Sequence, residues 1–127
     1  MSDTRRKALK YLRNRNPEDI SSKLVSASKF FEPEESWTQR ETWWFNLPIK
    51  RIRANRNGDY YLLGARNKKK SAFVVLRVPN KFIIKNVRRL ETRYDDKVIL
   101  HLAAYKDNWL VDERGKGQVD FSTFELS

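Results

Sequence analysis

Residues 72–78 read Ala-Phe-Val-Val-Leu-Arg-Val, a run in which Arg77 is the one polar side chain. A strand with one solvent-facing side alternates apolar and polar residues, whereas a strand covered on both faces is apolar almost throughout. The run therefore predicts a buried interior strand, which ends where Pro79 and Asn80 follow. A sheet built around this strand is the expected centre of the fold.

Three other segments predict partners for that strand. Residues 43–49 alternate apolar and polar side chains, as a half-buried strand does. Pro48 favours an edge or bulged position for this strand, because proline has no N–H to donate to a neighbour. Residues 60–63 form a second apolar run after a turn at Gly58, and residues 97–104 form a third.

Residues 16–31 predict an amphipathic helix. Asn16 suits the N-cap, Pro17 suits the first helical position, and two acids in the first turn complement the helix dipole. Four apolar residues then recur on one helical face: Ile20, Leu24, Ala27 and Phe31. The preceding residues 4–15 carry six basic side chains and form either a short basic helix or a mobile arm.

Length and element types together predict one α+β domain. The 127 residues suit a single core, and neither a linker nor an internal repeat is evident in the chain. We expect an antiparallel or mixed sheet of about four to six strands with one or two N-terminal helices packed on it. In this scheme residues 1–15 are the arm or short helix, and residues 16–127 are the globular core.

The composition excludes several classes of protein. The chain has no cysteine and one histidine, which rules out disulfides, thiolate metal sites and most histidine zinc sites. No run approaches the roughly 18 apolar residues of a membrane-spanning helix, and no secretory leader is recognisable. We therefore expect a cytoplasmic protein without a cofactor or a membrane partner, in which His101 is a hydrogen-bonded structural histidine.

Positive charge is concentrated in the middle of the chain. The net charge is +11, and residues 50–93 carry fourteen Lys and Arg against Asp59 and Glu91. Because such a concentration of charge repels itself, nucleic-acid phosphates are the expected partner, with an acidic protein or a merely solvated cationic surface as the alternatives. The candidate phosphate-binding residues are Arg51, Arg53, Arg56, Arg66, Lys68, Lys69, Lys70, Lys81, Lys85, Arg88, Arg89 and Arg93.

Aromatic residues accompany the basic segment. Alternation places Trp43 and Trp44 on opposite faces of their strand, so a single core cannot bury both unless the sheet is covered on both sides. We expect most of the aromatic rings to lie in the core, and Trp44 to be exposed together with either Tyr60 or Tyr61. An exposed ring among basic residues can stack on an unpaired base, which adds Trp44 to the candidate binding residues.

Three runs resemble, in the same order, the later strands of restriction-endonuclease-like proteins: residues 43–48 (WWFNLP), 59–63 (DYYLL) and 73–83 (FVVLRVPNKFI). The resemblance implies association with DNA rather than RNA, in an accessory or defence-related role. The Asp and Glu-x-Lys with which that family holds magnesium are missing here, so no catalytic or metal-binding residue is assigned. The enzymatic alternative is a divergent magnesium-dependent nuclease that uses Asp59 with an early glutamate.

Overall fold

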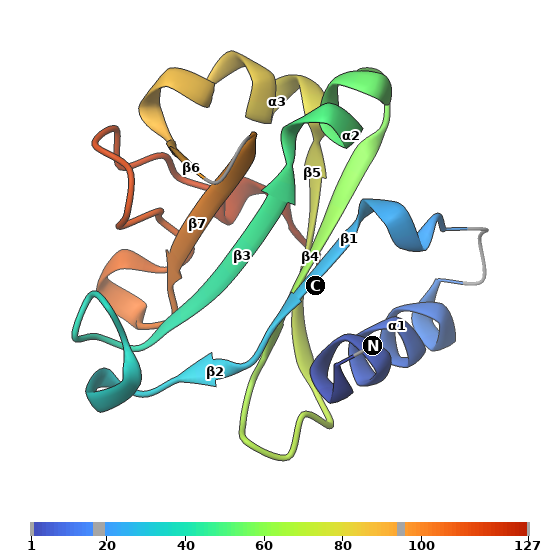
Figure 1. Cartoon of the computed structure of the whole chain (residues 1–127). Coiled ribbons are helices and arrows are strands. Elements are labelled where there is room, and N and C mark those ends of the chain that lie inside the picture. The colour runs from blue at the N-terminus through green and yellow to red at the C-terminus, as the bar shows by residue number, and fades with distance from the viewer. Residues whose placement is uncertain (1, 17–19, 94–95, 127) are drawn as a thin grey trace.

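Two four-stranded sheets pack against each other, and helix α1 (Asp3–Arg15) covers the outer face of the first sheet (Figure 1). The structure is a computed structural model that describes residues 2–16, 20–93 and 96–126. The α+β class and the packing of an N-terminal helix on a sheet are as predicted, with the strands divided between two sheets.

The first sheet has the order β1 (Val25–Ser28), β4 (Asp59–Ala65), β5 (Phe73–Pro79) and β8 (Glu125–Leu126). Its β1–β4 pair is parallel, and its other pairs are antiparallel. The second sheet is antiparallel and has the order β2 (Phe30–Phe31), β3 (Thr42–Pro48), β7 (Lys97–Ala103) and β6 (Glu91–Arg93). Two short helices, α2 (Ile49–Ala54) and α3 (Asn80–Lys85), follow β3 and β5.

The core between the sheets is built on one face of β3. Trp43, Phe45 and Leu47 are buried in it, whereas Trp44 and Asn46 point outward and are exposed. The facing and neighbouring strands complete this core with Tyr60, Leu62, Val74, Leu76, Val78, Val98, Leu100 and Leu102. Each such side chain contributes about 1.5–3 kcal/mol by leaving water, which explains the period-2 pattern of this segment.

Helix α1 forms because a short apolar stripe meets the outer face of the first sheet. The stripe consists of Ala8, Leu9 and Leu12. The Ser2 hydroxyl caps the helix by accepting a hydrogen bond from the Arg5 backbone N–H at 3.1 Å. The Arg5 guanidinium donates to the backbone carbonyls of Ser22 and Val25, which ties the helix to β1. Of the two alternatives for this segment, the short basic helix is the one the structure contains.

The helix predicted over residues 16–31 is wrong for residues 20–31, which contain no α-helix. Residues 17–19 of this prediction lie outside the described part of the chain. A 3-10 turn (Ser22–Leu24) leads into β1, and β2 follows after one residue. Val25 and Ala27 pack toward α1, so the true period of this segment is two. A β-branched residue and two serines give β1 a weak helix propensity. Its parallel hydrogen bonds to β4 therefore outweigh the N-cap and the apolar helical face that the sequence suggested.

β3 is an interior strand whose register with β7 continues without a bulge to Pro48, so the edge or bulged position predicted for it is wrong. It lies between β2 and β7, and Pro48 is its last residue, directly before α2. A missing N–H costs little there, because the chain leaves the sheet at that point. β5 is interior as predicted, and Val74, Val75 and Leu76 are buried in it.

A strand–proline–helix unit occurs twice, although no internal repeat was evident in the sequence. Residues 47–55 read LPIKRIRAN and residues 78–86 read VPNKFIIKN. In both units proline precedes a six-residue helix, which holds a fully buried isoleucine and ends at an asparagine. Asn55 and Asn86 each donate from Nδ2 to the carbonyl four residues earlier, at 2.9 Å. The repeat places α2 and α3 at the same end of the two sheets (Figure 1).

Candidate nucleic-acid interface

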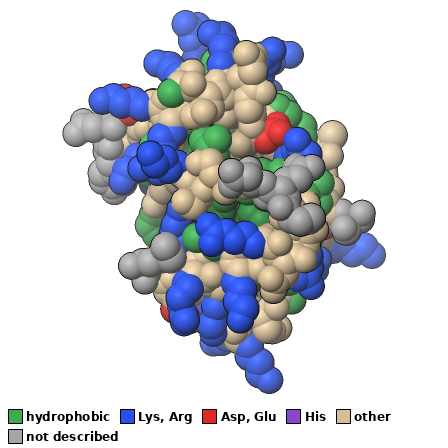
Figure 2. All heavy atoms as spheres, turned by 90° about the vertical axis from the view of Figure 1, so that its right-hand side faces the viewer, with side chains coloured by type: hydrophobic (Ala, Val, Ile, Leu, Met, Phe, Trp, Pro, Cys, Tyr) green, Lys and Arg blue, Asp and Glu red, His purple; other side chains and the backbone are tan. Residues whose placement is uncertain are grey.

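Eleven of the twelve predicted phosphate-binding residues fall into two groups at opposite ends of β4 and β5, and Arg93 lies on β6 of the second sheet. These strands are antiparallel, with α2 and α3 at one end and the loop of residues 66–71 at the other. The α2 and α3 end holds Arg51, Arg53, Arg56, Lys81, Lys85, Arg88 and Arg89, and the loop holds Arg66, Lys68, Lys69 and Lys70. Figure 2 shows Lys and Arg gathered at the top of the molecule, where α2 and α3 lie, and again toward the bottom, where α1 lies.

The end formed by α2 and α3 carries a cluster of exposed cations, here called the α2–α3 surface. It consists of Lys50, Arg51, Arg53, Arg56, Lys81, Lys85 and Arg88. Ile49 and Ile52 share the buried face of α2, which turns the basic side chains of this helix toward solvent. Within the described residues, none of the seven side chains forms a hydrogen bond or an ion pair. Their charge is therefore available to an external anion.

Asp59 and Asp96 are acids that approach this surface. The Asp59 carboxylate accepts from Arg77 Nε at 2.8 Å, so its charge is already matched by a cation outside the α2–α3 surface. Asp96 is exposed, and its backbone carbonyl accepts from the Ile49 N–H at 2.8 Å. The surface thus keeps a strong positive excess.

Asn80 fixes the two basic helices relative to each other. Its side chain is fully buried, and Nδ2 donates to the Asn55 carbonyl at 2.8 Å. Its backbone N–H donates to the Gly58 carbonyl at 3.0 Å. The start of α3 is therefore joined to the turn that follows α2, which makes one continuous surface of the two helices.

Replacing this asparagine tests the link. We expect Asn80→Ala to reduce the free energy of unfolding by about 0.5–1.5 kcal/mol, because the hydrogen bond from Asn80 to the Asn55 carbonyl is lost, although that carbonyl keeps the Gly58 N–H as a donor. Urea unfolding followed by circular dichroism measures this loss. Asn46→Ala, which removes an exposed asparagine from β3, is the control and should change stability by less than about 0.5 kcal/mol. Equal stability of Asn80→Ala and the wild-type chain would contradict the assigned role.

Arg89 and Arg93 are held by contacts within the protein. Arg89 donates to Asn86 Oδ1 at 3.1 Å and to the Gly117 carbonyl at 2.6 Å, which fastens the late loop to the end of α3. Arg93 Nε lies 2.6 Å from a Glu91 carboxylate oxygen. These two arginines therefore have structural contacts that the seven cations of the α2–α3 surface lack.

Two lysines of the β4–β5 loop (residues 66–71) lie beside acids. Lys68 Nζ is 3.4 Å from a Glu32 carboxylate oxygen, and Lys70 Nζ is 3.4 Å from Asp3 Oδ2. Asp3 also pairs with cations of its own helix, and the hydrogen bond from Arg6 is the main reason that its pKa is lowered. These contacts could not be predicted from the sequence, because both acids lie far from the lysines along the chain.

Helix α1 adds cations to the loop end that were absent from the predicted set. Lys7, Lys10 and Arg15 line a groove of about 330 Å³ together with Lys69 and Lys70. Lys7, Tyr11 and Arg15 recur every four residues and so lie on one face of α1, and this spacing is the signal in the sequence that could have identified them.

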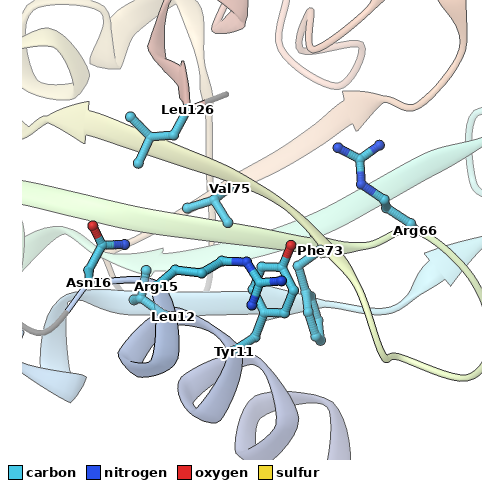
Figure 3. A pocket seen from close by; sticks show the side chains of 8 residues that line it. All are labelled: Tyr11, Leu12, Arg15, Asn16, Arg66, Phe73, Val75 and Leu126. Atoms are coloured by element: carbon cyan, nitrogen blue, oxygen red, sulfur yellow. The ribbon is translucent and has the colours of Figure 1, made fainter.

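A neighbouring pocket of about 440 Å³ lies between α1 and the first sheet (Figure 3). The Arg15 guanidinium stacks over the Tyr11 ring, with 3.6 Å between the guanidinium carbon and the ring centroid. Arg66 lines this pocket, away from α2 and α3. The stacked guanidinium therefore covers one face of the Tyr11 ring.

Trp44 is exposed, as predicted, whereas the exposure predicted for Tyr60 or Tyr61 is wrong. Trp44 is 42% exposed, and both tyrosines are buried. The first sheet is covered by the second sheet on one face and by α1 on the other, which buries both tyrosines on successive positions. Trp37 is the most exposed large aromatic ring in the described chain at 66%, and the sequence did not single it out.

Trp44 belongs to a pocket on the outer face of the second sheet, here called the tryptophan pocket. It has a volume of about 300 Å³, and its lining includes Phe31, Glu34, Glu35, Trp37, Trp44 and His101. His101 is paired across the strands with Trp44 and is only 2% exposed. Burial, and then the nearby Arg114 guanidinium, lower the pKa of His101 to about 4, so the imidazole is neutral at pH 7.

The described residues contain no group of three or more His, Asp or Glu that could share a metal ion. Asp59 lies at the α2 end of β4, whereas Glu32 contacts the loop at its other end and Glu34 and Glu35 line the tryptophan pocket. The acids named for a divergent magnesium site are therefore not brought together. Within the described ranges, no helix is both long and apolar enough to span a bilayer.

The resemblance to restriction-endonuclease-like proteins depends on residues 43–83 alone. No protein-family model, curated protein or solved structure matches this chain.

Proposed function

We propose that this protein binds nucleic acid and that the α2–α3 surface contacts the phosphate backbone. The observation that carries the proposal is the set of seven exposed cations that have no ion pair within the described chain. Cations that neutralise phosphates release the counterions condensed on nucleic acid, and this release drives binding. DNA is the expected form, on the strength of the resemblance noted in residues 43–83.

The arrangement of the cations favours a backbone-binding role over base readout. Lys50, Arg51 and Arg53 are borne by a helix of six residues whose other face is buried. Long cationic side chains on an outward surface reach phosphates without entering a groove, and such contacts position a protein without reading sequence. We therefore propose that the α2–α3 surface binds with little base preference.

The experiment is a binding panel of matched single- and double-stranded DNA and RNA, measured by fluorescence anisotropy. If four phosphates are contacted, the affinity for duplex DNA should fall roughly 100-fold between about 50 and 200 mM salt. Polyglutamate serves as the competitor that represents an acidic protein, and it should compete poorly. Absence of binding to every nucleic acid at the lower salt concentration would refute the proposal, and tight binding of polyglutamate alone would replace it with a protein partner.

The triple variant of the loop, in which Lys68, Lys69 and Lys70 become glutamine, should have a small effect. Two of these lysines already pair with acids. The variant should therefore release at most about one counterion fewer than the wild-type chain when it binds, and the slope of affinity against salt should change accordingly. We expect duplex affinity to fall by about threefold or less in the same anisotropy assay. A loss of tenfold or more would place the loop in the interface.

A further inference from the structure

The tryptophan pocket has a floor and two walls made of rings. The His101 ring centroid lies 5.5 Å from that of Trp37 and 5.4 Å from that of Trp44. The two indoles are steeply inclined to the imidazole, at 64° and 74°. Two exposed rings thus flank a buried one, and Phe31 packs against Trp44 at the side, with 6.4 Å between ring centroids. A flat ligand can contact the walls while an edge approaches the floor.

The volume and charge of this pocket limit what it can hold. About 300 Å³ is at the small end of ligand pockets and suits one ring system. The guanidinium carbon of Arg114 lies over the Trp37 ring, 4.9 Å from its centroid. Lys29 Nζ lies over the Phe31 ring, 5.0 Å from its centroid. Because cations of the protein already use these ring faces, an additional cation is disfavoured.

Unsatisfied polar atoms gather beside the same pocket. Four buried side-chain nitrogen or oxygen atoms of the described residues have no hydrogen-bond partner, and three of them belong to His101, Glu113 and Arg114. Arg114 Nη1 lies 3.4 Å from His101 Nε2, so these two residues form one cluster, whereas the other carboxylate oxygen of Glu113 accepts from Tyr105 and Asn108. Buried polar groups without partners are rare in proteins and call for an explanation, such as a bound ligand or water. Glu34 and Glu35 add carboxylate acceptors to the pocket lining.

We propose that the tryptophan pocket binds one unpaired nucleobase that carries an exocyclic amino group, with its ring against Trp37 and Trp44 and its amino group toward Glu34 or Glu35. Adenine, cytosine and guanine have such a group, and uracil and thymine do not. This proposal rests on the proposed nucleic-acid binding and names the part of a single strand that the pocket takes.

The pocket and the α2–α3 surface are joined by one strand. Trp44 lies near the start of β3, and Pro48, at its end, precedes α2. Four residues of a strand span roughly 13 Å, so a single strand with a base in the pocket can reach the basic helix with its backbone. A duplex keeps its bases stacked and paired, and therefore cannot use the pocket.

The first test uses free nucleosides, which lack phosphate and so do not report on the α2–α3 surface. Adenosine and cytidine should quench tryptophan fluorescence saturably and bind more tightly than uridine. Trp37→Ala and Trp44→Ala should each weaken this binding by about fivefold or more, because a base loses a stacking partner. Both rings are substantially exposed, so these variants should remain folded. The double variant Glu34→Gln/Glu35→Gln should bind cytidine and uridine equally.

Tyr11→Ala is the matched control, because it removes a ring from the other aromatic and basic pocket. It should leave nucleoside binding unchanged, and weakening in this variant would move the site to the pocket beside α1. Trimethyllysine is the second probe, and binding tighter than that of adenosine would identify a cage for cations instead. The proposal would also be overturned if no nucleoside quenched the tryptophan fluorescence saturably.

Oligonucleotides separate this proposal from the proposed function. Trp44→Ala should weaken single-stranded DNA binding about fivefold or more and leave duplex binding unchanged. If duplex DNA binds and nucleosides do not, the pocket proposal fails while the phosphate surface stands. If nucleosides bind and no duplex does, the phosphate surface fails while the pocket stands.

Discussion

A variant that lacks the four cations of α2 and its following turn is expected to bind duplex DNA roughly 100-fold or more weakly near 0.1 M salt. The substitutions are Lys50→Gln, Arg51→Gln, Arg53→Gln and Arg56→Gln. All four side chains are exposed and form no ion pair with described residues, so their removal should change stability little. Each phosphate contact that disappears should make the salt dependence shallower by about 0.9 in log–log slope.

Fluorescence anisotropy over a salt series measures both the affinity and the slope. The control variant removes the same number of charges elsewhere on the surface, by Lys10→Gln, Arg13→Gln, Lys23→Gln and Lys69→Gln. If net charge alone drove binding, the two variants would lose affinity equally. We expect the control to lose less than about tenfold, and equal losses would show that the α2–α3 surface is not the interface.

The second large effect concerns pH and stability. An ordinary histidine in the unfolded chain titrates near 6.5, whereas the pKa of His101 in the folded chain is lowered to about 4 by burial and by Arg114. Below pH 6.5 the unfolded state therefore binds a proton that the folded state does not. The stabilisation is present in full above about pH 6.5 and is lost as the pH falls toward 4, by up to about 3 kcal/mol.

The difference between the wild-type chain and His101→Gln isolates this contribution. Urea unfolding at a series of pH values from about 7.5 to 4 gives the free energy of unfolding of each protein. Other groups near His101, namely Glu91, Asp112 and Arg114, are the same in both proteins and largely cancel. The wild-type chain should lose stability relative to the variant below pH 6.5. Parallel pH profiles would show that His101 titrates normally.

Patterns that depend on near neighbours in the chain were predicted correctly from the sequence. Continuous apolar character identified β5 as an interior strand, because covering both faces requires it. Strict alternation identified β3 and placed Trp44 on its outer face. The concentration of positive charge in residues 50–93 was likewise a property of the chain itself.

Predictions failed where a distant segment decided the outcome. Residues 25–28 had the apolar spacing of a helix but form β1. These residues have a weak helix propensity, so pairing their backbone N–H and C=O groups with β4 is more stable than an isolated helix would be. Pro48 suggested an edge strand, and the start of α2 made its missing N–H irrelevant. Tyr60 and Tyr61 were both buried because α1 covers the face that would otherwise be open.

The sequence by itself determined the fold class, the interior strand and the number and sign of the charges, since composition and periodicity express these directly. The tertiary structure alone decided which cations remain available. Folding brings Asp3 to Lys70 and Glu32 to Lys68, and it sets α2 beside α3 through Asn80. It also assembles Trp37, Trp44 and His101 into one pocket. Ion pairs and pockets depend on distances in space, and residues 25 to 67 positions apart in the chain meet only after the sheets have formed.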